Sequence, residues 1–217
     1  MPTSVDKFTS RIAGRVQGAP SETIRQALID ATSEFCEKSR IWNEIQDAQI
    51  VVSGVSDYEV DLPSRAKPLS IETVWCGQRP LRAVTMGQLQ TLLPDWQTAV
   101  GTEPLYYNSA FDWNTFRVYP MPLDVVGAQL RIKGSFQPSE DADTLPDFLW
   151  ERWRTALTAG ALALLQTQFG KAWFNLQQAD INRTIFTSQI GDATIARMRE
   201  GASNHMTVTP RAFGSRP

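Results

Sequence analysis

Four acidic residues close together in the sequence are the side chains best suited by type to acid and base chemistry. They are Glu140, Asp141, Asp143 and Asp147. A glycosidase needs only two carboxyl groups, one to protonate the leaving oxygen and one to act as base or nucleophile. The same residues precede a segment of helical character, where acidic side chains are favourable at the positive end of the helix. We therefore expect a structural role for them and keep a carboxylate-dependent hydrolase only as an alternative.

Other catalytic and metal-binding groups are scarce. The single histidine, His205, lies in a polar stretch, whereas a general base must be held within hydrogen-bond reach of its nucleophile. The sequence has neither the Cys and His spacing of a zinc site nor a glycine-rich phosphate loop. Cys36 and Cys76 lie in an apolar helical stretch and a strand-like stretch, which predicts two buried, reduced thiols. We expect no catalytic residue, no metal and no cofactor.

The composition is that of a globular chain. Of the 217 residues, 42% are hydrophobic, and 21 Lys and Arg stand against 23 Asp and Glu. A chain of this size buries roughly 70% of its unfolded surface, and a near-neutral charge argues against a protein that grips DNA. No apolar run reaches the ~20 residues that cross a bilayer. The start also lacks the basic and apolar regions of a secretory signal. We expect a chain that stays where it is made and meets no membrane.

Helical periodicity predicts helices towards both ends of the chain, and these elements must position any site. Apolar residues recur every three or four positions over 5–16 and 20–40. After a proline and an acid typical of a helix start, an Ala- and Gly-rich helix is predicted to end before a glycine at 170. A second helix is then expected over 171–199, with Gly191 as a weak point.

The middle of the chain, from about 48 to 137, has the period of two that is typical of strands. Tyr58, Val60 and Leu62 alternate with acidic residues, and 128–133 alternates in the same way. This pattern predicts half-buried strands in a small antiparallel sheet or sandwich. One interruption resembles a capping box and predicts a short helix over 85–93. The expected fold class is therefore α+β.

The last predicted helix carries two apolar stripes on opposite sides. One stripe contains Leu176, Ala179, Phe186, Ile190 and Ala193, and the other contains Phe174, Ile181 and Ile185. A helix at the surface of a monomer needs only one such stripe. The second stripe indicates either a helix buried centrally in its own domain or a contact with another subunit, and both interpretations stay open at this point.

The C-terminal residues 201–217 contain no acid and no periodic pattern, but they include Arg211, Phe213 and Arg216. Such a segment has too little apolar surface to order itself. Aromatic residues and arginine are preferred anchors at interfaces. A docking tail is therefore our interpretation, beside the simpler one of a frayed terminus.

The order of these features resembles the head-to-tail adaptor proteins of tailed bacteriophages, from about residue 20 to 214. The matching segments are Ile24 to Glu37, Trp42, Tyr58 to Pro63, Leu145-Pro146, Gly160 to Ala163, Lys171-Ala172-Trp173 and Pro210 to Phe213. They are packing and capping residues, so no reaction is implied. The competing interpretations are a carboxylate-dependent, tail-associated hydrolase and an unrelated oligomeric scaffold or binding module.

The resemblance implies an α+β subunit with an antiparallel helical bundle beside a small antiparallel sheet and an extended tail. It implies a ring, commonly of twelve subunits, beneath the portal at the head-tail junction of the virion, made in the host cytoplasm. The partners implied are the portal protein, other copies of the chain, tail, nozzle or tail-fibre proteins, and double-stranded DNA that passes without sequence recognition. The tail would enter the portal, with Phe213 as anchor and Arg211 and Arg216 making polar contacts.

Four regions follow from these patterns. We expect an N-terminal helical part over 1–47, an antiparallel β-domain over 48–140, C-terminal helices over 141–200 that complete the bundle, and the docking tail over 201–217. The expected contacts between subunits are made by Phe174, Ile181 and Ile185.

Overall fold

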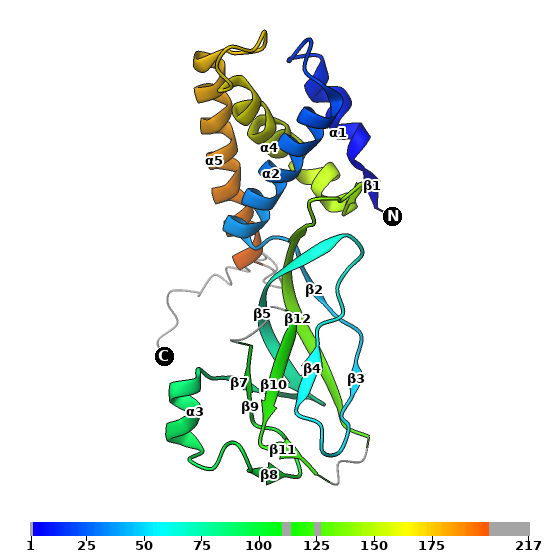
Figure 1. Ribbon diagram of the computed structural model, residues 1–217, viewed down its shortest axis with the longest axis vertical. Helices are drawn as coiled ribbons and strands as arrows, with labels where there is room; N and C mark the ends of the chain where they lie inside the picture. The colour runs from blue at the N-terminus through cyan, green and yellow to red at the C-terminus, as the bar shows by residue number, and fades with distance from the viewer. Residues whose placement is uncertain (1, 110–113, 124–126, 200–217) are drawn as a thin grey trace, which may run out of the picture.

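The computed structural model describes residues 2–109, 114–123 and 127–199, which form a helical half and a β half stacked along the long axis (Figure 1). The helical half contains α1 (Val5–Ala13), α2 (Ser21–Ser39), α4 (Asp147–Gln166) and α5 (Leu176–Met198). The β half contains the remaining helix, α3 (Met86–Leu92). The predicted α+β class is confirmed.

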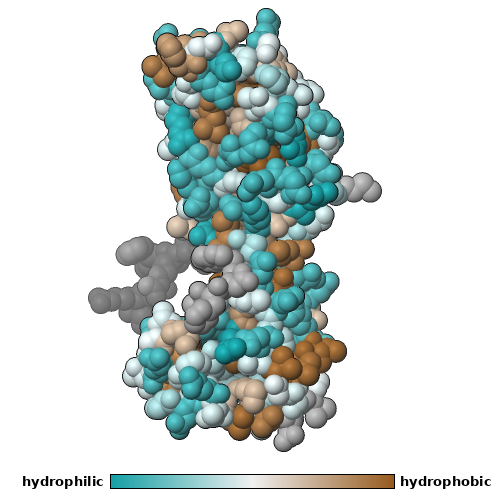
Figure 2. All heavy atoms as spheres, in the orientation of Figure 1, coloured by the Kyte–Doolittle hydropathy of each residue, from teal (hydrophilic) through white to brown (hydrophobic). Residues whose placement is uncertain are grey.

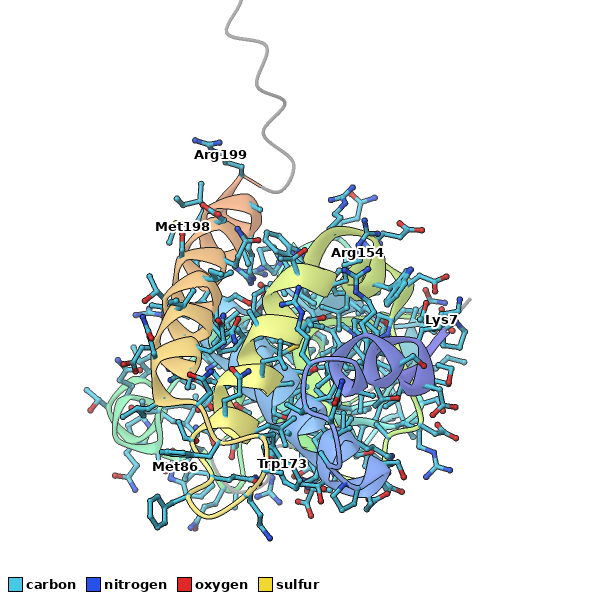
Figure 3. The ribbon with its side chains drawn as sticks, turned by 90° about the horizontal axis from the view of Figure 1, so that it is seen from above. Lys7, Met86, Arg154, Trp173, Met198 and Arg199 are labelled. Atoms are coloured by element: carbon cyan, nitrogen blue, oxygen red, sulfur yellow. The ribbon has the colours of Figure 1, made fainter. Side chains whose placement is uncertain are left out.

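Helix α4 is the centre of the helical half because it packs against α1, α2 and α5. Seen from above, α5 lies on one side of α4 and α1 on the other (Figure 3). Gly160 of α4 permits this packing, since a Cβ atom there would lie 2.7 Å from the ring of Phe186 in α5. The ring of Phe35 in α2 lies between those of Trp153 and Phe186, at centroid distances of 5.5 and 6.1 Å.

The β half is built from short strands around two long ones. Its strands are β2 (Asn43–Ile45), β3 (Gln49–Ile50), β4 (Asp57–Glu59), β5 (Ala66–Cys76), β6 (Arg79–Pro80), β7 (Arg82–Ala83), β8 (Val100–Gly101), β9 (Tyr106–Asn108), β10 (Thr115–Tyr119), β11 (Met121–Pro122) and β12 (Gln129–Pro138). Two further strands, β1 (Thr3–Ser4) and β13 (Thr144–Leu145), pair with each other beside α1 in the helical half (Figure 1). The larger sheet has the order β2-β12-β5-β6, with β3 also paired to β12, and the second has the order β4-β10-β9-β7. Most pairs are antiparallel as predicted, but β7–β9 and β8–β11 are parallel.

Alternation along the two long strands separates a buried face from an outer face of the larger sheet. Leu130 and Ile132 of β12 and Val74 of β5 are fully buried. The pairing of β5 with β12 shifts register twice, and the first shift leaves Glu72 of β5 without a partner opposite it. Such a bulge redirects the extra side chain.

Several helix boundaries differ from those predicted. The first helix ends at Ala13 rather than 16. The last begins at Leu176 rather than 171, because Gly170 adopts a φ of +78° in the preceding turn and Asn175 then caps the helix. Gly191 lies inside α5 without interrupting it. The capping box predicted for the short helix α3 is confirmed, since Thr85 and Gln88 make both of its hydrogen bonds.

Candidate subunit interface

The inner side of α5 is fixed against the rest of the helical half. Ala179, Phe186, Ile190 and Ala193 are buried, as one stripe of the sequence predicts. Asn182 lies among them, and its amide nitrogen donates to the side-chain oxygen of Gln166 in α4 at 2.8 Å. Because a buried amide is costly without partners, this bond defines how α5 is rotated on α4.

Hydrogen bonds between charged side chains further fix the orientation of α5, this time against α2. Arg183 of α5 donates two hydrogen bonds to the Glu34 carboxylate of α2, at 2.9 and 2.6 Å, and Lys38 donates a third at 2.6 Å. Burial alone would raise the pKa of Glu34, but the hydrogen bonds from Arg183 and Lys38 outweigh it and lower the pKa. The guanidinium of Arg183 also lies over the Phe186 ring, 5.6 Å from its centroid. These contacts fix the orientation of α5 relative to α2.

With its inner side fixed, α5 leaves apolar side chains on its outer side. Ile181 and Ile185, one turn apart, are 48% and 40% exposed. Ile195, which the sequence pattern did not single out, is 48% exposed and lies on the same side at 100° per residue. We call Ile181, Ile185 and Ile195 the α5 outer stripe. The second stripe is predicted either to be buried inside the domain or to contact another subunit. Burial inside the domain is wrong, because the described residues leave this stripe exposed.

The third predicted interface residue, Phe174, lies in the turn before α5. It is 39% exposed, and its ring packs edge to face on that of Phe169 at a centroid distance of 5.5 Å. Phe169 is 89% exposed, and apolar side chains gather at this end of the molecule (Figure 2). Sequence periodicity could not identify Phe169 because it lies in a turn. Leu176, placed in the inner stripe by periodicity, is 55% exposed at the first residue of the helix.

The acidic cluster is arranged as a set of surface ion pairs. Arg65 contacts Asp141 at 2.6 Å and Asp143 at 3.9 Å, and Lys67 contacts Glu140 at 2.7 Å. The hydrogen bond from Lys67 lowers the pKa of Glu140, and that from Ser139 lowers the pKa of Asp141. A glycosidase acid requires the opposite, a carboxyl group whose pKa is raised. The three carboxylates of this cluster are therefore engaged by basic side chains at the surface.

Asp147 has a similar structural role at the start of α4. The Thr3 hydroxyl donates a hydrogen bond to its carboxylate, which lowers its pKa and joins the N-terminal strand to the helix.

Neither cysteine forms a disulfide. Cys36 is fully buried in α2, and burial raises the pKa of its thiol far above the usual range. Cys76 is only partly buried, and desolvation raises its pKa as well. The described residues contain no group of three metal-binding side chains. None of their helices is both long enough and apolar enough to traverse a membrane.

The predicted tail residues Arg211, Phe213 and Arg216, like His205, lie outside the described residues.

Comparison with known proteins identifies the family of the chain. No curated protein matches the chain. The model of the SU10 adaptor protein family matches residues 3–211, which is nearly the whole chain and includes both halves of the structure. The chain therefore belongs to the SU10 adaptor protein family and is a phage head-to-tail adaptor.

Proposed function

We propose that this adaptor forms a ring, of twelve subunits by its resemblance to other adaptors, between the portal and the tail. The ring extends the channel through which double-stranded DNA passes, and its far side receives tail, nozzle or tail-fibre proteins. A net charge of −2 suits a channel that binds DNA weakly and without sequence recognition.

The observation that carries the proposal is the α5 outer stripe. A ring requires heterologous contacts, in which two different surfaces of one subunit meet on neighbouring copies. Helix α5 lies at the side of the helical half, away from α1 (Figure 3). Its exposed isoleucines offer the apolar surface for one side of such a contact, with Phe174 at the adjacent turn.

The second part of the proposal concerns the portal. The segment 201–217 follows α5 in the sequence and its end docks on the portal, where Phe213 fills an apolar pocket and Arg211 and Arg216 make polar contacts. Aromatic and arginine side chains supply most of the binding energy at many interfaces.

A pair of variants tests the subunit contact. Ile181→Ser with Ile185→Ser removes two exposed apolar side chains without opening the core, so the monomer should fold normally. Leu176→Ser is the matched control, since Leu176 is equally exposed at 55% but lies on another side of α5. Light scattering in the presence of portal should show rings for the control and not for the double variant. Normal rings from the double variant would exclude this surface.

The portal contact is tested separately by removing residues 201–217, and by Phe213→Ala in the full chain. Both changes should weaken portal binding in a sedimentation assay while circular dichroism stays unchanged. Full portal binding by the shortened chain would contradict the docking tail.

A further inference from the structure

The larger sheet has an outer face whose residues follow from the strand register. Side chains directly opposite each other on neighbouring strands point to the same face. Lys133 of β12 pairs with Thr73 on one side and with Ile45 on the other. Arg131 pairs with Trp75, and Gln129 pairs with Ile50. We call the surface made by Ile45, Ile50, Thr73, Trp75, Arg131 and Lys133 the outer β face.

Next to the outer β face, the same side of the sheet is covered by the ends of two helices. Ser135 points to this side by alternation along β12, yet it is fully buried. Its hydroxyl donates to Glu72 at 2.5 Å and lies 3.3 Å from that of Ser70, which accepts from Arg40 at the end of α2 at 2.7 Å. Arg197, in the last turn of α5, forms an ion pair with Glu72.

The outer β face itself is open. Ile45 and Ile50 are 61% and 67% exposed, and apolar side chains gather on the side of the β half along which β2 and β3 run (Figure 2). Trp75 is partly exposed and belongs to neither apolar core cluster among the described residues. Trp75 on β5 and the two isoleucines on β2 and β3 flank Arg131 and Lys133 of β12, so exposed apolar side chains lie on both sides of the central strand. Exposed apolar surface of this kind is often an interaction site.

The chain itself leads onto this face. The Arg197–Glu72 ion pair holds the end of α5 beside Thr73, the first residue of the outer β face along β5. The Nε group of Arg197 is buried, and no described residue accepts a hydrogen bond from it. A buried donor without a partner is rare, so an acceptor remains to be supplied at this edge of the outer β face.

The composition of the following residues suits this location. Residues 201–209 carry no Asp, Glu, Lys or Arg, so they do not repel Arg131 and Lys133, and they include Met206 and Val208 as apolar contacts. Eight extended residues span at most about 28 Å. Four strands spaced about 4.8 Å apart cover about 14 Å, which such a segment can cross.

We propose that residues 202–209 of the same chain lie across the outer β face and cover Trp75. Residues 210–217 then begin at the edge of the outer β face rather than at the end of α5, and they extend beyond the sheet from there. This docking is a property of the single subunit and holds whichever partner the terminal residues bind.

A spin label tests the proposal in the full-length monomer. Cys76→Ser leaves the fully buried Cys36 as the one native thiol, and Thr207→Cys supplies the labelling position. Amide signals of Thr73, Trp75 and Arg131 should lose most of their intensity, while those of α3 keep theirs. A label at Ser10→Cys, exposed on α1 in the other half, is the matched control and should leave the outer β face unchanged.

Two results would overturn the proposal. One is a label at position 207 that leaves Thr73 and Trp75 unaffected. The other is signal loss that persists when the label is carried only by a second copy mixed with the observed one, since the segment would then dock on a neighbour.

Proteolysis gives a second measurement. Trypsin cleaves after Arg199, and Trp75→Ala should accelerate that cleavage by roughly tenfold, because local opening controls the rate. Trp173→Ala, which changes a partly exposed tryptophan at the α4–α5 turn, should leave the rate unchanged. Equal rates for the wild type and Trp75→Ala would contradict docking on Trp75.

Discussion

At the scale of single residues, Gly160 is a position where three helices approach one another closely. A Cβ atom there would lie 2.7 Å from the Phe186 ring and 3.0 Å from the Cβ of Ala31. The helices α2, α4 and α5 are close because this position has no side chain. Gly191, in contrast, is a helical glycine with open space around it.

These two glycines predict opposite effects of the same substitution. Gly160→Ala should lower the free energy of unfolding by about 1 to 3 kcal/mol, as overpacked cores do. Gly191→Ala should raise it by about 0.5 to 1 kcal/mol, because alanine is the better residue inside a helix. Urea titration measures both, and a Gly160→Ala variant as stable as the wild type would contradict the packing described.

Glu34 predicts a dependence of stability on pH. Its pKa in the folded chain is below the ordinary value of 4.5, so its contribution is complete above pH 4.5 and is lost as the pH falls through the folded pKa. Glu34→Gln should therefore cost about 0.5 to 1 kcal/mol near neutral pH, as for partly exposed ion pairs. The difference from the wild type should shrink in denaturation experiments towards pH 3. A difference independent of pH would contradict the role of the Arg183 and Lys38 bonds.

At the scale of elements, sequence patterns located helices better than they located contacts between them. The capping box at Thr85 and the alternation at Tyr58 are local, so each could be predicted without the fold. The bulge at Glu72 and the pairing of β1 with β13 depend on residues that are distant in sequence. A local sequence pattern therefore could not predict either of them. Within the site, periodicity found Ile181 and Ile185, but it missed Phe169, which lies in a turn.

Helix α3 predicts a local effect of its cap. The Thr85 hydroxyl accepts from the Gln88 backbone at 3.3 Å, and replacing such a cap by alanine costs about 1 kcal/mol. Thr85→Ala should accelerate hydrogen exchange at the Leu89 amide, which bonds the Thr85 carbonyl at 2.9 Å. Thr91→Ala, in the same helix but away from the cap, is the control and should change this exchange little. Unchanged exchange in Thr85→Ala would show that Leu89 is held by packing alone.

At the scale of the whole molecule, the α5 outer stripe and the outer β face both expose large apolar side chains among the described residues, and they lie in different halves. The α5 outer stripe belongs to the helical half and the outer β face to the β half. We assign the first to neighbouring subunits and the second to the chain's own C-terminal segment. The proposed contact between subunits and the proposed docking of the C-terminal segment therefore use separate halves of the molecule.

The central claim, assembly of this adaptor with the portal, is tested most directly by the solution mass of the purified chain. Light scattering should be recorded on the chain alone and after mixing with the matching portal protein. We expect either a mass near twelve subunits or a monomer that enters a large complex when portal is added. A chain that stays monomeric and indifferent to the portal would contradict the account.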